Sequence, residues 1–177
     1  MDDTPDVLPD PAPDPAPDTV EPFDTRAAYH LALVGAIEQA LAQRSREMIW
    51  MDRDFADWPL DDTHLIEALQ AWLKLPGRRL VMLASEFQTI GRAHARFVHW
   101  RRDWSHVVIG RIPETLEPAS FDSALVTDDG LAVALHDPTR FWGWQARSGV
   151  AARELRRRID AYAQQSEEAF PTTVLGV

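Results

Sequence analysis

Residues 121–135 have the sequence FDSALVTDDGLAVAL. Two apolar runs, 123–127 and 131–135, lie on either side of the pair Asp129-Gly130. An Asp-Gly pair between apolar runs is typical of a tight hairpin turn. We therefore predict a β-hairpin with strands at Ser123–Thr127 and Leu131–Leu135.

Strands and helices alternate before the hairpin. Short apolar runs at 47–52, 79–84 and 106–112 predict buried strands. Amphipathic helices are predicted at 27–42 after a Thr25 cap, from the Asp61-Asp62-Thr63 cap to Pro76-Gly77, at 92–102 and, after the hairpin, at 147–165. This order favours parallel pairing with right-handed crossovers. The predicted fold class is a single α/β domain with a mostly parallel sheet, a C-terminal hairpin strand pair and flanking helices.

The first 22 residues differ from the rest in composition. They hold six Asp, one Glu and no basic residue, so they carry −7 of the net charge of −10 and leave −3 for residues 23–177. Seven prolines between 5 and 22 favour extended conformers with little to bury. We predict a disordered acidic tail at 1–22, acting as a solubilising extension or as a ligand for another protein, and one folded domain at 23–177.

Composition excludes several classes of protein. No apolar run approaches the roughly 20 residues of a membrane helix, and the first residues are acidic where a secretory signal is basic. Cysteine is absent, which excludes disulfides, thiolate metal sites and a cysteine nucleophile. We expect a cytoplasmic protein with no membrane association. No His pair has metal-ligand spacing, so we expect neither a metal nor a cofactor.

The order of elements resembles one half of a phospholipase D-like domain. In that superfamily the hairpin region carries the pattern His-x-Lys-x-x-x-x-Asp, followed by a Gly-Ser-x-Asn segment. The resemblance implies a histidine that attacks phosphorus and a lysine that neutralises phosphate oxygens. Here Phe121 stands for the histidine and Ser123 for the lysine, while Asp128 keeps the carboxylate. The later segment falls near Leu135-His136-Asp137-Pro138, without its glycine or serine.

The chain also resembles an uncharacterised bacterial family of degenerate domains of this kind. The matching segments are Trp58-Pro59-Leu60 and residues 169–173, Ala-Phe-Pro-Thr-Thr. Members of that family resemble domains joined to acetyltransferases, which implies a protein partner such as an acetyltransferase. No activity comes with this resemblance.

Acidic residues provide the candidates for catalysis. Asp52 and Asp54 follow the first strand of the 47–84 region, at the end where open α/β sheets bind ligands, and they could act as an acid and base pair. The interpretation that we favour is a strand end followed by a solvated loop, in which Arg53 pairs with these carboxylates. An enzyme with relocated catalytic groups would depend on Asp52 and Asp54 together with Glu86, His106 and Asp128.

Basic and aromatic residues provide the candidates for binding. Residues 92–111 contain five arginines against one acid, with Arg101, Arg102, Trp104 and His106 as the predicted binding residues. A packed helix with a solvated basic face explains the same residues. Arginines at 153, 156, 157 and 158 form a second basic surface that could hold the acidic tail, and Phe141, Trp142 and Trp144 are interpreted as an aromatic loop.

The interpretation that we favour is a non-catalytic α/β module that binds a partner protein or an anionic ligand. One alternative is a hydrolase-type enzyme with relocated catalytic residues. A nucleic-acid-associated protein using the stretch 92–111 is the other. We expect little nucleic-acid binding, because the folded part is slightly acidic and Lys74 is its only lysine.

Overall fold

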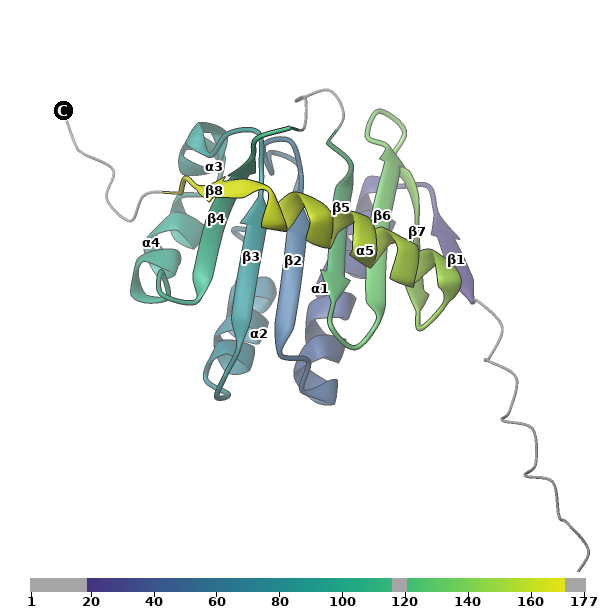
Figure 1. Cartoon of the computed structure of the whole chain (residues 1–177), viewed down its shortest axis with the longest axis horizontal. Helices are drawn as coiled ribbons and strands as arrows, with labels where there is room; N and C mark the ends of the chain where they lie inside the picture. Colours follow the sequence, from purple (N-terminus) through teal and green to yellow (C-terminus); the bar gives the residue numbers. More distant parts are fainter. Residues whose placement is uncertain (1–18, 116–120, 171–177) are drawn as a thin grey trace, which may run out of the picture.

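A computed structural model describes residues 19–115 and 121–170. These residues form one domain around an eight-stranded sheet with the order β1-β7-β6-β5-β2-β3-β4-β8 (Figure 1). The strands are β1 Val20–Phe23, β2 Glu47–Met51, β3 Arg79–Leu83, β4 Val108–Pro113, β5 Ser123–Thr127, β6 Leu131–Asp137, β7 Trp142–Arg147 and β8 Ser166–Glu168. The helices are α1 Arg26–Gln43, α2 Thr63–Leu73, α3 Gln88–Ala93, α4 Ala95–Asp103 and α5 Val150–Gln164.

The sheet is mostly antiparallel, so the predicted mostly parallel sheet is wrong. Only the pairs β2–β3 and β3–β4 are parallel among the described strands, and these are the three strands that the strand–helix alternation predicted. β5 pairs antiparallel with β2. The connection at 114–122 is shorter than the dozen or more residues of a crossover, so the chain re-enters the sheet at the rim where β4 ended. The predicted hairpin is present as β5–β6, and Gly130 has the positive φ of 95° that its turn requires.

Helices cover the two faces of the sheet unequally. α5 alone crosses one face, while α1 and α2 lie behind the sheet in the same view (Figure 1). The α5 face is built from small and β-branched residues such as Ala124, Ala132 and Val126, packed under Leu155 and Ile159. The opposite face carries the larger core, with most of the buried aromatic rings. Below, these are called the α5 face and the α1–α4 face.

Helix ends follow the predicted caps. The Thr25 hydroxyl accepts a hydrogen bond from the Ala28 amide at 3.1 Å, and the Asp62 carboxylate accepts bonds from the first turn of α2. The helix predicted at 92–102 is two helices, α3 and α4. His94, with φ −135° and ψ 61°, separates them, and its buried ring lies 3.0 Å from the Phe55 carbonyl oxygen.

Three strands were missing from the sequence prediction. β1 pairs with β7, so residues 20–22, which the prediction assigned to the tail, belong to the sheet. The predicted aromatic loop at 141–144 is mostly β7, and β8 follows α5 directly. Of the predicted tail, residues 1–18 lie outside the described residues, as do 171–177. Phe170, the last described residue, is buried against Phe87, with ring centroids 4.5 Å apart.

Candidate functional site

Ser123, at the position that the resemblance assigns to lysine, lies in the core. It begins β5, and the register places it beside Asp52 at the rim where the parallel strands end, called the C-terminal rim here. Its side chain is on the α1–α4 face and it is only 8% exposed. The Tyr29 hydroxyl lies 2.6 Å from the Ser123 Oγ, and the Trp58 indole N–H donates to the same oxygen at 2.9 Å. The Ser123 hydroxyl is therefore already hydrogen bonded inside the protein.

Aromatic rings fill the space around this hydroxyl. The Trp58 ring centroid lies 5.1 Å from those of Trp50 and Phe55, and its ring meets Tyr29 edge-on at 6.4 Å. Phe141 lies 6.2 Å from Tyr29 on the other side. Burial raises the pKa of Tyr29 well above its usual value, so this phenol is neutral at physiological pH. We call Tyr29, Phe55, Trp58, Ser123 and Phe141 the aromatic plug.

Asp52 holds the plug in place. Its Oδ1 accepts hydrogen bonds from the backbone amides of Asp54 and Phe55, at 3.0 and 2.7 Å, and its Oδ2 accepts from the Trp58 indole at 3.1 Å. Phe55 has a φ of 57°, which is uncommon for a bulky residue and requires the surrounding structure to maintain it. The bonds from Asp52 provide that support.

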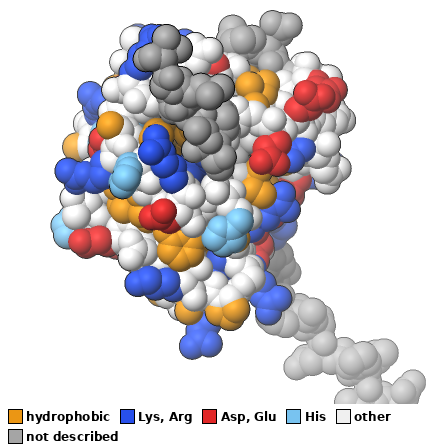
Figure 2. Space-filling view, turned by 90° about the vertical axis from the view of Figure 1, so that its left-hand side faces the viewer, with side chains coloured by type: hydrophobic (Ala, Val, Ile, Leu, Met, Phe, Trp, Pro, Cys, Tyr) orange, Lys and Arg blue, Asp and Glu red, His pale blue; other side chains and the backbone are white. Residues whose placement is uncertain are grey.

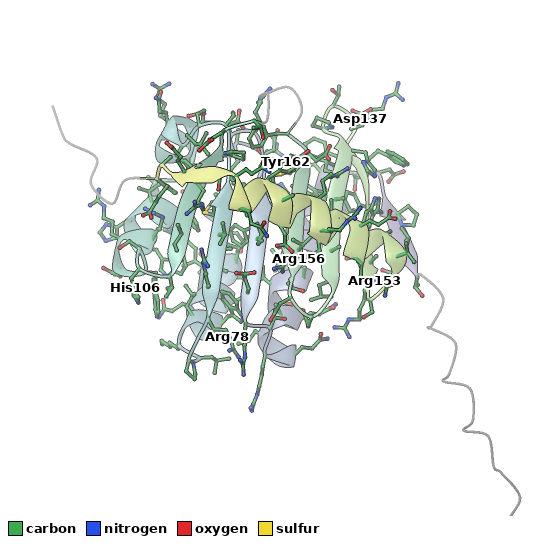
Figure 3. All side chains as sticks on the ribbon, viewed as in Figure 1. Arg78, His106, Asp137, Arg153, Arg156 and Tyr162 are labelled. Carbon is green, nitrogen blue, oxygen red and sulfur yellow. The ribbon has the colours of Figure 1, made fainter. Side chains whose placement is uncertain are left out.

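The other predicted catalytic residues do not meet in one site. Asp54 accepts from the Ala56 amide and pairs with Arg53, and Glu86 accepts from Thr89 at the start of α3. Asp128 lies at the opposite rim, where both of its oxygens accept from the Arg46 amide. His106 lies just before β4, and therefore at the same rim as Asp128, far from Asp137 and the C-terminal rim (Figure 3). Each carboxylate stabilises a local turn, and Asp52 and Asp128 cannot share a ligand.

The predicted binding residues of α4 separate in the same way. Arg101 is buried, at 3% exposure, whereas Arg102 and His106 are exposed and Trp104 is half-buried. Arg101 donates to the carbonyl oxygens of Val108 at 3.2 Å and Phe170 at 2.9 Å, and its guanidinium lies 3.8 Å from the Phe170 ring centroid. Burial lowers the pKa of Arg101 to about 10, opposed by Glu168, so it stays charged at neutral pH.

Arg101 therefore joins α4 and β4 to the segment after β8, and it does not face solvent. On the face of the molecule at the α4 end of the sheet, basic side chains alternate with acidic and apolar ones instead of forming one patch (Figure 2).

A different group of side chains faces solvent on α5. Arg156 forms ion pairs with Glu47 and Asp160. Burial lowers the pKa of Arg156, but its hydrogen bonds to these two carboxylates outweigh burial and raise the pKa above its usual value. Arg158 pairs with Asp122. The exposed side chains of Arg153 and Arg157 have no hydrogen bond or ion pair within the described part of the chain.

Beside α5 the surface is hollowed and aromatic. A hollow of about 720 Å³ lies between α5 and the β6–β7 pair; it is lined by His136, Trp144, Leu155, Arg157 and Arg158, among others. The Trp144 indole donates to the His136 Nε2 at 2.8 Å, and Trp142, 51% exposed, has its ring 5.4 Å from that of His136. This arrangement was not predicted from the sequence. The alternation Trp142-Gly143-Trp144 is typical of a strand, in which every second side chain lies on the same face.

No family model matches the chain, and no curated protein matches it. Solved structures do. TrmBL2, an archaeal chromatin protein described with a novel mode of DNA binding, superposes with a TM-score of 0.60 at 13% identity over 85% of this chain. The match spans about half (53%) of that protein's chain.

Two phospholipase D-type structures match over nearly their whole length. Nuc from Salmonella typhimurium, a phospholipase D family member, has a TM-score of 0.59 at 13% identity. The match covers 87% of this chain and 99% of the Nuc chain. NucT from Helicobacter pylori has a TM-score of 0.54 at 5% identity, covering 86% and 99%. Identities this low establish the fold and nothing more: the chain has a phospholipase D-like fold.

Two further observations concern metals and membranes. Among residues 19–115 and 121–170, no three His, Asp or Glu side chains are grouped so that they could hold a metal ion. No helix within the same residues is long and apolar enough to cross a membrane.

Proposed function

We propose that this chain is a degenerate, non-catalytic phospholipase D-like domain that acts by binding a partner protein or an anionic ligand. The observation that carries the proposal is the Ser123 hydroxyl, which is buried and bonded to Tyr29 and Trp58 where the resemblance puts a phosphate-binding lysine. A serine in this position supplies no positive charge for a phosphate. The aromatic plug also occupies the space that a substrate would need.

Among the described residues, three side chains beside Ser123 do not supply the missing nucleophile. Phe121 has no nucleophilic atom, and it packs against the core of the α5 face. Tyr29 is neutral because burial raises its pKa, and Asp52 already accepts three hydrogen bonds. The alternative of relocated catalytic residues therefore gains no support from Phe121, Tyr29 or Asp52 at this rim.

A phosphodiesterase assay tests the proposal. We expect the full chain to release no p-nitrophenolate from bis(p-nitrophenyl) phosphate above the rate in buffer, with or without added divalent cations. Ser123→Ala and Tyr29→Phe serve as matched variants that change the plug. Turnover by the full chain that either variant abolishes, while circular dichroism shows both folded, would show that the plug is a working site.

The nucleic-acid alternative is weakened by the burial of Arg101. Of the predicted binding residues, only Arg102 and His106 are exposed on that surface, and lysine is nearly missing from the chain. We expect labelled single-stranded DNA and RNA to bind weakly at low salt and not at moderate salt. Tight binding that falls steeply with salt and is lost in Arg102→Ala would overturn this expectation, because phosphate contacts release counterions.

The resemblance to domains joined to acetyltransferases gives the protein partner that we propose. The direct test is to mix the chain with an acetyltransferase from the same organism and to measure the mass of the eluted species by size-exclusion chromatography with light scattering. Two separate elution peaks at micromolar concentrations would argue against this partner.

A further inference from the structure

The N-terminal segment leaves the sheet beside the first turn of α5. Val20 of β1 pairs with Ala146 of β7, and β7 ends at Arg147, only three residues before α5 begins at Val150. Figure 3 shows Arg153 at this end of the helix, with Arg156 further along it. Residues that precede Val20 therefore start next to the basic surface of α5.

The outer surface of α5 carries an excess of positive charge: the exposed Glu154 lies among its arginines but, within the described residues, forms no ion pair with them. Arg153 and Arg157 are one turn apart and both exposed, with no carboxylate paired to either within those residues. Like charges at this spacing destabilise a helix slightly unless an anion lies between them. The first turn of α5 also contains no acidic residue, although the N-terminal end of a helix favours negative charge.

Aromatic surface continues from these arginines. Arg157 lines the hollow between α5 and the β6–β7 pair, and Trp144 and His136 line it from the other side. Trp142 adds an exposed indole next to His136. A basic surface beside exposed aromatic rings matches an acidic, proline-rich peptide, because extended proline-rich segments pack on aromatic grooves.

The chain itself contains such a peptide. Residues 1–18 read MDDTPDVLPDPAPDPAPD, with six Asp, six Pro and no basic side chain. In an extended proline-rich conformation 18 residues reach about 56 Å, whereas the 15 residues of α5 span about 22 Å. The segment is long enough to follow the whole helix and to reach the hollow.

We propose that residues 1–18 bind in cis along the outer surface of α5, with their carboxylates on Arg153 and Arg157 and their prolines against the Trp142–Trp144 surface. The segment then competes with any anionic partner of α5, so the partner must displace it. This proposal does not depend on the absence of catalysis, and its failure would leave the proposed function standing.

Paramagnetic relaxation in the full chain tests it. The chain lacks cysteine, so Ala12→Cys supplies a single site for a nitroxide label. At low salt we expect the label to broaden the amide signals of α5 and β7, relative to the reduced, diamagnetic sample. Raising the salt to several hundred millimolar should remove the broadening, because exposed charges are then screened within a few ångströms.

Charge reversal distinguishes α5 from the other basic surface. We expect Arg153→Glu with Arg157→Glu to reduce the broadening to the diamagnetic level, and Arg92→Glu with Arg102→Glu, a matched pair of exposed arginines on α3 and α4, to leave it unchanged. Broadening centred on α3 and α4, or none above the diamagnetic level in the unreversed chain at low salt, would overturn the proposal. Amide spectra of the two double variants check that each remains folded.

Discussion

The two faces of the sheet use their polar side chains differently. On the α1–α4 face, Ser123, Asp52 and Arg101 are all bonded within the protein, to an indole, to loop amides or to carbonyl oxygens. On the α5 face, Arg153 and Arg157 project into solvent. Ser123 and Asp52 at the C-terminal rim are thus bonded into the core, whereas these two arginines of α5 remain accessible to a ligand.

The largest effect is expected where charge would be placed in the aromatic plug. Ser123→Lys should lower the free energy of unfolding by about 3–5 kcal/mol, because the longer side chain would overfill the packed rings and its buried ammonium would compete with the Trp58 indole for Asp52. Ser123→Ala should cost only about 1–2 kcal/mol through the lost hydrogen bonds. Urea denaturation measures both. A stable Ser123→Lys variant, above all one that hydrolyses phosphodiesters together with Phe121→His, would mean that the plug accepts a charged group and phosphodiester chemistry.

Two neighbouring arginines allow a sharper test of burial. Arg101→Met should lower the free energy of unfolding by about 2–4 kcal/mol, since the carbonyl oxygens of Val108 and Phe170 would lose their donor. Arg102→Met changes an exposed side chain and should stay within about 0.5 kcal/mol of the original chain. Equal costs for the two variants, measured by the same urea titration, would contradict the buried position of Arg101.

Tyr29 makes stability depend on pH in the alkaline range. Its pKa in the folded state is raised above that of the unfolded state, so the folded state keeps its proton at a pH where the unfolded state has lost it. The contribution of Tyr29 is therefore complete below pH 10 and decreases above it, by up to about 1.4 kcal/mol per pH unit.

Tyr29→Phe isolates this contribution. The variant should lose about 1–2 kcal/mol at neutral pH, and above pH 10 the difference from the original chain should shrink. Denaturation at a series of pH values measures the difference. A gap that stays constant from neutral to strongly alkaline pH would show that Tyr29 ionises as it does in water.

Deletions at the N-terminus sharpen the boundary of the sheet. Removing residues 1–18 should change the free energy of unfolding by no more than about 0.5 kcal/mol, because the binding proposed above rests on exposed ion pairs and on a solvent-accessible aromatic surface. Removing residues 1–22 takes away most of β1 and should cost about 1–2 kcal/mol by leaving β7 at the edge of the sheet. Thermal melts of the two truncated chains should differ in this order, and identical melts would make β1 irrelevant to stability.

The smallest effect is expected on the α5 face. Arg153→Met and Arg157→Met should each stay within about 0.5 kcal/mol in the same urea titration, since neither side chain is paired within the described residues. A loss of several kcal/mol would mean that these arginines hold the fold, as Arg101 does, and would remove the contrast between the faces.

The sequence predicted the elements whose pattern is local. The hairpin turn at Gly130, the strand at 47–51 and the caps at Thr25 and Asp62 each depend on residues close together in the chain, and all are present. β8 could not be found in this way, because Ser-Glu-Glu has no apolar pattern. β1 contains Pro22, which is tolerated because β1 is an edge strand.

Sequence reasoning about the candidate site was less successful for a related reason. It placed Asp52 correctly at the end of β2. The hydrogen bond that the Trp58 indole donates to Asp52, however, depends on a loop that turns back through Phe55 at positive φ. The roles of Arg101 and Arg102 differ because the helix splits at His94 and the segment at Phe170 folds over α4. Adjacent arginines in a sequence give no indication of such packing.

The sheet order also fixes the distance between the two ends of the domain. β1 and β8 are opposite edge strands, separated by seven strand spacings of about 4.8 Å, or about 34 Å in all. Arg101 fixes the segment at Phe170 to one edge, and the pairing with β7 fixes Val20 to the other. The segments that continue from Val20 and from Phe170 therefore start on opposite edges of a rigid sheet.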